Sequence, residues 1–409
     1  MTPLRKKLIA ASAGTLAAIL VAETLLRLVG FSHPPFYRPD DDRGWRLAAN
    51  TSGWYTAEGR SWVETNAAGL REEELAVERP AGEYRIAVLG DSMTEGLQVA
   101  REETFTEVIE RRLAGCPALP AGTGTAKTRS VEAINFGVSG YGTAQELLTL
   151  RHLALDYDPQ LVVLALYSGN DLADDSRDLS GDPRRPYFTL GDDGTPVLDD
   201  SFRDSGAHRV RTIPGMGLAY FVAGHSRLLQ LAAVLRGRVR HAPPAPPTPG
   251  GEPRPAPDDA VYLDPPPDET WRRAWAVTEA LVTATAEESR AAGADFLLVT
   301  LSTGAQAHPD AELRRRFTAS LAEIAPGGEA PADLLAPERR LAATARRQGF
   351  RMLALAPRIA RRAEAAGAPL HGAGGFGHYD AAGHRAAGEI VAAEICHGWG
   401  APLASAGGT

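Results

Sequence analysis

The 409-residue chain has only two cysteines, Cys116 and Cys396, and no Cys/His spacing typical of a metal site. It has no internal repeat, and its clusters of basic residues are short. Its net charge of −8 gives no indication of nucleic-acid binding. The composition is otherwise ordinary for a globular protein, with 44% hydrophobic residues. At 409 residues the chain can bury a large core, with room for one large domain plus appendages.

The first 31 residues depart most from that composition. Residues 5–7 are basic and precede an uncharged stretch over 8–22, a pattern typical of an export signal. With Glu23 at the far interface, the segment to about residue 31 is long enough to cross a bilayer. Because no small-residue cleavage site follows, we favour a single-pass membrane anchor over a secreted protein with a cleaved signal. A third alternative is an amphipathic helix packed on a soluble domain. The basic flank places the following chain outside the cytoplasm.

Strand and helix signals alternate along the rest of the chain. Residues 32–80 are expected to form a β-rich leader, and residues 81–400 the main domain. Alternation of this kind predicts a three-layer α/β/α sandwich around a flavodoxin-like parallel sheet. Strands are expected at 84–89, 130–136, 160–167, 294–301 and 350–355, and helices at 102–114, 143–153, 270–292, 311–324, 336–348 and 379–395.

Two segments interrupt this alternation. An insertion over residues 172–236 is expected to contain a β-hairpin around an Asp193-Gly194 turn, followed by one helix from about Leu218 to Leu235. Residues 237–267 are so rich in proline that we expect a linker or mobile loop that cannot form part of a core.

The two cysteines lie at the ends of expected helices. Cys116 ends the helix after the first core strand, and Cys396 ends the last helix. In a flavodoxin-like sheet these two helices lie side by side on one face. Since cysteine pairs outside the cytoplasm can oxidise, a Cys116–Cys396 disulfide is predicted.

Four blocks of small or polar residues fall at one edge of the predicted sheet, where open α/β sheets bind ligands. Ser92 follows the first strand, Gly140 the second and Asn170 the third, and His378 precedes the last helix. Each has an ordinary explanation alone: a helix cap, a turn glycine, an Asx turn and a surface histidine. Together they favour a serine nucleophile with a base and oxyanion donors.

In this order, the blocks resemble the SGNH family, also called GDSL esterases and lipases, of the membrane-anchored bacterial type. Gly90-Asp91-Ser92 is similar to the first family block, Ser139-Gly140 to the second and Asn170-Asp171 to the third. Met93 stands where leucine is usual, and Ser168 replaces a common glycine. The resemblance covers residues 80–171 and 290–396, and extends weakly to residues 66–71.

The resemblance implies that Ser92 is the nucleophile and His378 its general base. The oxyanion hole would consist of the backbone N–H groups of Ser92 and Gly140 and the side chain of Asn170. A serine needs a base to accept its proton at neutral pH, and histidine suits that task. No cofactor is implied.

The expected activity is that of an extracytoplasmic serine esterase acting on a small-molecule or polysaccharide ester that carries an O-acyl or O-acetyl group. Two alternatives stay open. One is an O-acyltransferase acting on surface polysaccharide, in which a sugar hydroxyl replaces water. The other is a non-catalytic carbohydrate-binding relative.

One family residue is missing. The last block usually has an aspartate three residues before the histidine, where this chain has Gly375. Either His378 is the base, oriented by a backbone carbonyl or by a carboxylate from elsewhere, or His384 is the base with Asp380 as its partner. We favour His378, because His384 is expected to lie a turn inside the last helix, with Asp380 as its N-cap.

Three further residues have structural explanations. Asp91 is expected to hold the strand-end turn by accepting backbone hydrogen bonds. Asp171 is expected to cap or brace the turn at Asn170. For His308, which follows another strand end, a solvent-exposed loop position is favoured over one that lines the substrate site.

Overall fold

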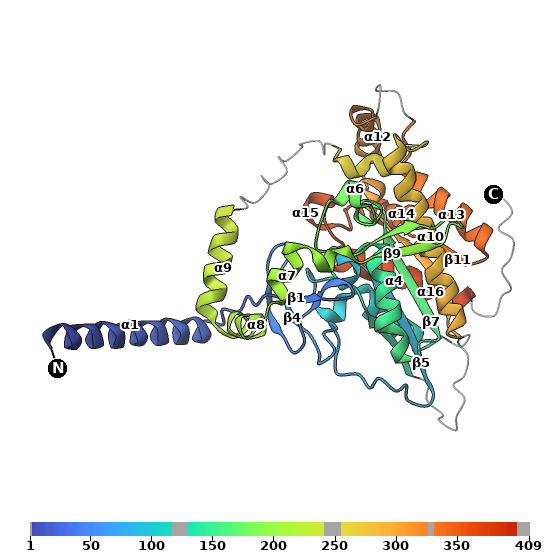
Figure 1. The fold of residues 1–409 in the computed structure, drawn as a ribbon. Coiled ribbons are helices and arrows are strands. Elements are labelled where there is room, and N and C mark those ends of the chain that lie inside the picture. The colour runs from blue at the N-terminus through green and yellow to red at the C-terminus, as the bar shows by residue number, and fades with distance from the viewer. Residues whose placement is uncertain (1, 117–118, 120–129, 241–254, 326–330, 399–409) are drawn as a thin grey trace.

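The computed structural model describes residues 2–116, 119, 130–240, 255–325 and 331–398. At its centre lies a five-stranded parallel sheet in the order β11-β10-β7-β5-β6 (Figure 1). This is the flavodoxin-like order predicted from the sequence. The strands are β5 (Glu83–Gly90), β6 (Ser130–Asn135), β7 (Leu161–Tyr167), β10 (Asp295–Leu301) and β11 (Arg351–Ala354).

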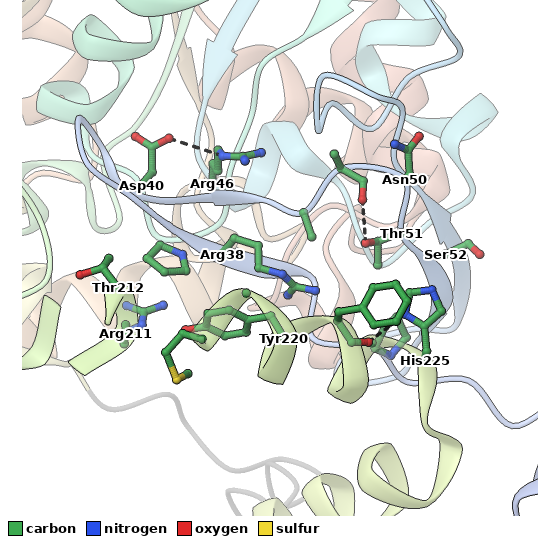
Figure 2. Close-up of a pocket in the computed structure, with 18 of the residues that line it drawn as sticks. Arg38, Asp40, Arg46, Asn50, Thr51, Ser52, Arg211, Thr212, Tyr220 and His225 are labelled. Carbon is green, nitrogen blue, oxygen red and sulfur yellow. Dashed lines mark hydrogen bonds and ion pairs between the residues drawn. The ribbon is translucent and has the colours of Figure 1, made fainter. Parts of the chain in front are cut away.

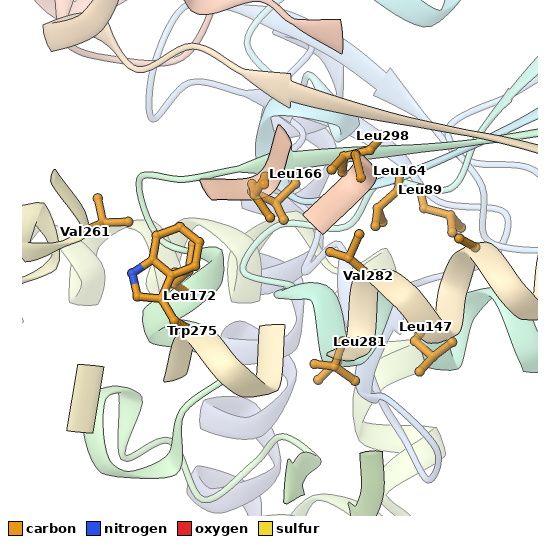
Figure 3. Packing of buried hydrophobic residues seen from close by; sticks show 14 of the residues in the cluster. Leu89, Leu147, Leu164, Leu166, Leu172, Val261, Trp275, Leu281, Val282 and Leu298 are labelled. Carbon is orange, nitrogen blue, oxygen red and sulfur yellow. The ribbon is translucent and has the colours of Figure 1, made fainter. Parts of the chain in front are cut away.

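Helices cover both faces of the sheet, so its strands consist largely of apolar residues. Alternate side chains of each strand enter two separate buried clusters. One cluster, part of which Figure 3 shows, includes α4 (Thr143–His152), α10 (Glu269–Ala291) and α13 (Ala336–Gln348). The other includes α3 (Phe105–Leu113), α14 (Ala356–Ala366) and α16 (Ala381–Gly398). The three-layer sandwich is therefore confirmed.

Antiparallel hairpins lie outside this sheet. The leader forms β1 (Tyr37–Asp40) with β2 (Gly44–Leu47), and β3 (Ser52–Tyr55) with β4 (Ser61–Glu64). The hairpin predicted in the insertion is β8 (Tyr187–Leu190) with β9 (Pro196–Asp199). Further helices are α1 (Pro3–Leu28), α2 (Ser92–Glu95), α5 (Asp171–Asp174), α6 (Arg177–Ser180), α7 (Gly206–Thr212), α8 (Met216–His225), α9 (Arg227–Arg240), α11 (Gly304–Ala307), α12 (Ala311–Ser320) and α15 (Gly372–Gly375).

The prediction of a single helix from about Leu218 to Leu235 is wrong. The chain forms α8 and α9, which meet at Ser226 with a bend of 92°. Ser226 has an extended backbone, and its hydroxyl accepts a hydrogen bond from Leu229 N (3.3 Å). The carboxylate of Glu23, in α1, accepts hydrogen bonds from Arg227 N and Leu228 N. A helix start capped in this way competes with continuation of α8.

The expectation that the whole of residues 237–267 lies outside the core is also wrong. Residues 241–254 lie outside the described part of the chain, but Ala260, Val261, Tyr262 and Leu263 are buried in the cluster of Figure 3. The hydroxyl of Tyr262 lies 2.7 Å from Thr303 Oγ1. Four consecutive apolar or aromatic side chains outweigh the neighbouring prolines, one of which begins a 3₁₀ helix at Pro257.

The predicted disulfide is present. Helices α3 and α16 pack together on one face of the sheet, and Cys116 is bonded to Cys396 just beyond the end of α3. The reasoning from helix order was sufficient, because the sheet order fixes which helices are neighbours.

Helix α1 extends away from the main body and packs against it only near its C-terminal end (Figure 1). None of its side chains is buried, and its length and apolar composition are sufficient to cross a membrane. A signal sequence would have the same properties.

Candidate active site

Ser92 lies at the first position of α2, directly after β5. Asp91 caps this helix by accepting a hydrogen bond from Met93 N (2.8 Å), as predicted. Burial raises the pKa of the Asp91 carboxyl. The turn needs a glycine at position 90, since a Cβ there would lie 2.1 Å from Thr94 Oγ1. Strand, turn and cap together present the Ser92 hydroxyl at the carboxyl end of the sheet.

His378 reaches Ser92 from the loop before α16. Its Nε2 lies 2.8 Å from Ser92 Oγ. The loop is held on both sides: the carbonyl of His378 accepts a hydrogen bond from Gly372 N (2.7 Å), and the buried hydroxyl of Tyr379 accepts one from Ser302 N (2.9 Å). The structure therefore brings together the two residues expected to be nucleophile and base.

Glu58 completes this arrangement from the β3–β4 turn of the leader. Its Oε2 lies 2.5 Å from His378 Nδ1, and its Oε1 accepts a hydrogen bond from His378 N (3.0 Å). Gly377 makes room for the carboxylate, because a Cβ at this position would lie 1.9 Å from Glu58 Oε1. Sequence reasoning allowed for a carboxylate from elsewhere but did not find Glu58, which lies 320 positions from His378 and in no recognised motif.

Glu58 and His378 each shift the pKa of the other toward its charged form. The hydrogen bond from His378 lowers the pKa of Glu58. Burial lowers the pKa of His378, but the hydrogen bond and charge of Glu58, together with the charges of Asp91 and Glu95, outweigh burial and raise it overall.

His384 has a structural environment. It is fully buried, stacks on Phe105, and its Nδ1 accepts a hydrogen bond from Phe105 N (3.2 Å). Burial lowers its pKa to about 3. Asp380 accepts a hydrogen bond from Gly383 N (2.8 Å) at the start of α16, which is the capping role predicted for it. His384 and Asp380 therefore do not form the alternative pair.

Ser139-Gly140, the second sequence block, is held by contacts from three side chains. Gly140 has φ +76°, a conformation that favours glycine. The carboxylate of Glu95 accepts hydrogen bonds from both the backbone N–H and the hydroxyl of Ser139. Trp45 Nε1 donates to Ser139 O (3.0 Å), and Arg185 Nη2 donates to Gly140 O (2.7 Å). The bond to Ser139 O holds the peptide whose N–H group is expected to serve as an oxyanion donor, and the bonds to Ser139 N and Gly140 O hold the peptides on either side of it.

Asn170-Asp171, the third sequence block, is linked through Asp174 to Arg185, the side chain that also contacts Gly140. Asn170 Nδ2 donates to Asp174 Oδ2 (2.9 Å), and Asp174 Oδ1 lies 2.9 Å from Arg185 Nη1. An amide has two hydrogens, so this bond orients Asn170 and leaves one hydrogen for an oxyanion. Asp171 accepts a hydrogen bond from Tyr167 N (2.7 Å) and braces the turn as expected.

The leader contacts α2, the short helix that begins at Ser92. Tyr37 donates its hydroxyl to the carboxylate of Glu95 (3.0 Å), in α2, and buried Arg71 donates to the backbone carbonyl of the same residue (3.0 Å). Burial raises the pKa of Glu95 to about 7. The leader is therefore part of the site and not a spacer between α1 and the sheet.

His308 differs from its expected position. It is only partly exposed and stacks on Phe376, with ring centroids 5.5 Å apart. Its Nδ1 accepts a hydrogen bond from Asp310 N (3.1 Å). Packing against the loop that carries His378 explains why it is not a free surface histidine.

Comparison with known proteins gives fold-level likenesses. No family model and no curated protein matches the chain. Similar solved structures include TesA (16% identity, TM-score 0.36, 76% of this chain and 97% of that one). They also include a catalytic mutant of Axe2, an acetylxylan esterase from Geobacillus stearothermophilus (12%, 0.37, 77% and 95%). A third is a GDSL-like lipase from Bacteroides thetaiotaomicron (12%, 0.33, 77% and 88%). These overlaps are loose, so the chemistry is argued from this chain's own residues.

Proposed function

We propose that the chain is an SGNH-type serine esterase that hydrolyses a carboxylic ester outside the cytoplasm. The observation that carries the proposal is the chain of contacts from Ser92 Oγ to His378 Nε2 and from His378 Nδ1 to Glu58, at 2.8 and 2.5 Å. A hydroxyl in contact with a histidine that is itself oriented by a carboxylate is the arrangement that activates serine.

In the proposed reaction, Ser92 Oγ attacks the acyl carbon while His378 Nε2 takes its proton. Glu58 holds the Nδ1–H group and stabilises the imidazolium. The N–H groups of Ser92 and Gly140 and the Asn170 amide would stabilise the tetrahedral oxyanion, each contributing about 3–4 kcal/mol. His378 then protonates the leaving alkoxide, and a water molecule activated by the same histidine releases the acid from the acyl-enzyme.

Acyl transfer is the alternative that uses the same residues, because a sugar hydroxyl can replace water in the second step. The non-catalytic alternative loses its support, since it depended on the missing aspartate at Gly375 and Glu58 supplies a carboxylate to His378. The two catalytic alternatives differ in their products when no sugar acceptor is present: hydrolysis releases acetate or another acid, and acyl transfer does not.

The proposal is tested with p-nitrophenyl esters of increasing chain length and the full chain in detergent. We expect hydrolysis by the wild type, none by Ser92→Ala, and labelling of Ser92 by a fluorophosphonate probe. Absence of both hydrolysis and labelling would contradict the proposal. Labelling without hydrolysis, followed by transfer when a saccharide acceptor is added, would favour the acyltransferase.

The choice of base is tested by comparing two histidine variants. His378→Ala should lower kcat by about 10⁴-fold or more, because Ser92 loses its proton acceptor. His384→Ala should lower the melting temperature by leaving a cavity beside Phe105, and keep kcat of the folded protein within about tenfold. Loss of activity only in folded His384→Ala would overturn the assignment.

A further inference from the structure

An exposed apolar surface lies on α8, far along the chain from α1. Residues 213–224 contain no charged side chain. Leu218 is 69% exposed, Phe221 58% and Val222 42%. The preceding Ile213 is 51% exposed. A water-facing surface this apolar and this continuous is typical of a binding surface.

This surface is fixed to the C-terminal end of α1. The carboxylate of Glu23 accepts hydrogen bonds from the backbone N–H groups at the start of α9. The Arg27 side chain donates a hydrogen bond to His225 O (2.5 Å). Figure 1 shows α8 beside this end of α1, with α9 running across the direction of α1. If α1 crosses the bilayer, α8 therefore lies at the outer membrane surface and α9 runs along it.

Arginines line a cavity of about 840 Å³ between α8 and β1 (Figure 2). Ile213 and Phe221 of the apolar surface also line this cavity. Arg38 and Arg211 come from β1 and α7, and Arg38 lies over the ring of Tyr220 at 5.0 Å. Within the described residues, neither of these two arginines forms an ion pair. Guanidinium groups without a carboxylate partner, next to an apolar helix, are complementary to phosphate groups above acyl chains. The remaining charged lining residues are Arg27, Asp40, Asp41, Arg46 and Arg227.

We propose that α8, α9 and this arginine-lined cavity form a second membrane-contacting surface. The apolar side chains of α8 enter the outer leaflet, and Arg38 and Arg211 bind the phosphate groups of its lipids. Helices with an apolar face and nearby basic residues bind the interface in this way, more strongly where the lipids are anionic. The surface would hold the domain in one orientation over the bilayer, which a single flexible attachment would not.

The depth of α8 is measured on the full chain in vesicles of phosphatidylcholine with phosphatidylglycerol. Since Cys116 and Cys396 are bonded to each other, Leu218→Cys accepts a single environment-sensitive fluorophore. Asp193→Cys, in the exposed β8–β9 turn, is the matched control. We expect emission at position 218 to be at least about twofold higher than at 193 and to be quenched by nitroxides on the acyl chains.

Two results would overturn the proposal. One is that position 218 escapes acyl-chain quenchers and behaves like position 193. The other is that its emission depends on the ratio of protein to lipid and not on the quencher, which would indicate that a second copy of the chain covers α8.

The arginines are tested by the dependence of the position-218 signal on anionic lipid. In the wild type, quenching should increase with the phosphatidylglycerol fraction. The Arg38→Gln/Arg211→Gln variant should lose this dependence, and Arg315→Gln, on exposed α12, should keep it. Ester hydrolysis in solution serves as the check that each variant is folded. Equal quenching in neutral and anionic vesicles would show that the two arginines give no preference for anionic lipid and would contradict this part of the proposal.

Discussion

The contact between Glu58 and His378 joins a leader residue to a loop residue of the main domain and shifts the pKa of the imidazole. Each partner shifts the other toward its charged form, so the pKa of Glu58 is lowered and that of His378 is raised. The proposed base acts only when it is neutral. Hydrolysis should therefore increase with pH through the pKa of His378, which lies above the usual 6.5.

Glu58→Gln should lower kcat by about 10⁴-fold, because the amide holds the imidazole less well and cannot stabilise the imidazolium. Without the anion, the pKa of His378 falls, so the acidic limb of the kcat/KM profile should move to lower pH. Both effects are measured with one soluble ester over a range of pH.

The matched control is Glu64→Gln, in β4 of the same hairpin, whose carboxylate accepts a hydrogen bond from Trp62 Nε1. It should leave kcat and the pH profile unchanged. A Glu58→Gln enzyme with an unmoved acidic limb would show that Glu58 does not set the protonation of His378.

At the scale of elements, the segment after β7 supports two of the three expected oxyanion donors, Gly140 and Asn170, through Arg185. This side chain bonds to Gly140 O and to Asp174, which in turn orients Asn170. Arg185→Ala should lower kcat by about 10- to 100-fold, because small displacements of a catalytic group are costly. KM should change little, since the oxyanion forms only after binding.

Arg184→Ala is the control for this variant. Arg184 neighbours Arg185 but is exposed and pairs with Asp182. Its replacement should leave both constants near the wild-type values. A rise in KM alone in Arg185→Ala would mean that Arg185 contacts substrate and does not position the donors.

The disulfide joins α3 to α16 across 280 residues, so it constrains a large part of the unfolded chain. Its reduction should lower the free energy of unfolding by about 2–5 kcal/mol. Urea unfolding with and without reductant measures the difference, and Cys116→Ser/Cys396→Ser should not respond to reductant. Titration of two thiols in denaturant before any reduction would contradict the bond.

Local sequence patterns were sufficient to predict the sheet and part of the candidate site. The apolar run of β7 and the glycine turn after β5 each specify their own structure, and strand order then places Ser92 near His378. Glu58 could not be predicted in this way, because its position depends on how the leader hairpin packs on the main domain. The break at Ser226 was missed for the same reason, since its capping carboxylate, Glu23, belongs to α1.

At the scale of the whole molecule, the basic residues 5–7 at the N-terminal end of α1 predict its direction in the membrane. A membrane-impermeant maleimide should label Asp193→Cys in intact cells or spheroplasts, and should label Thr2→Cys only after permeabilisation. The reverse pattern would place the proposed active site in the cytoplasm. Release of a form that lacks residue 2 would instead indicate a cleaved signal.

Because the carboxylate that contacts His378 belongs to the leader, the site of a proteolytic cut would decide its effect. A cut just after Leu28 would separate from α1 a fragment that still carries Glu58 together with Ser92 and His378. A cut between Glu58 and β5 would leave Glu58 on the membrane-bound piece, held to His378 only by non-covalent contacts. On the proposed mechanism, two cleavages within about 50 residues of each other would have opposite outcomes: an active enzyme no longer joined to α1, or a fragment with an intact sheet and a weakened base.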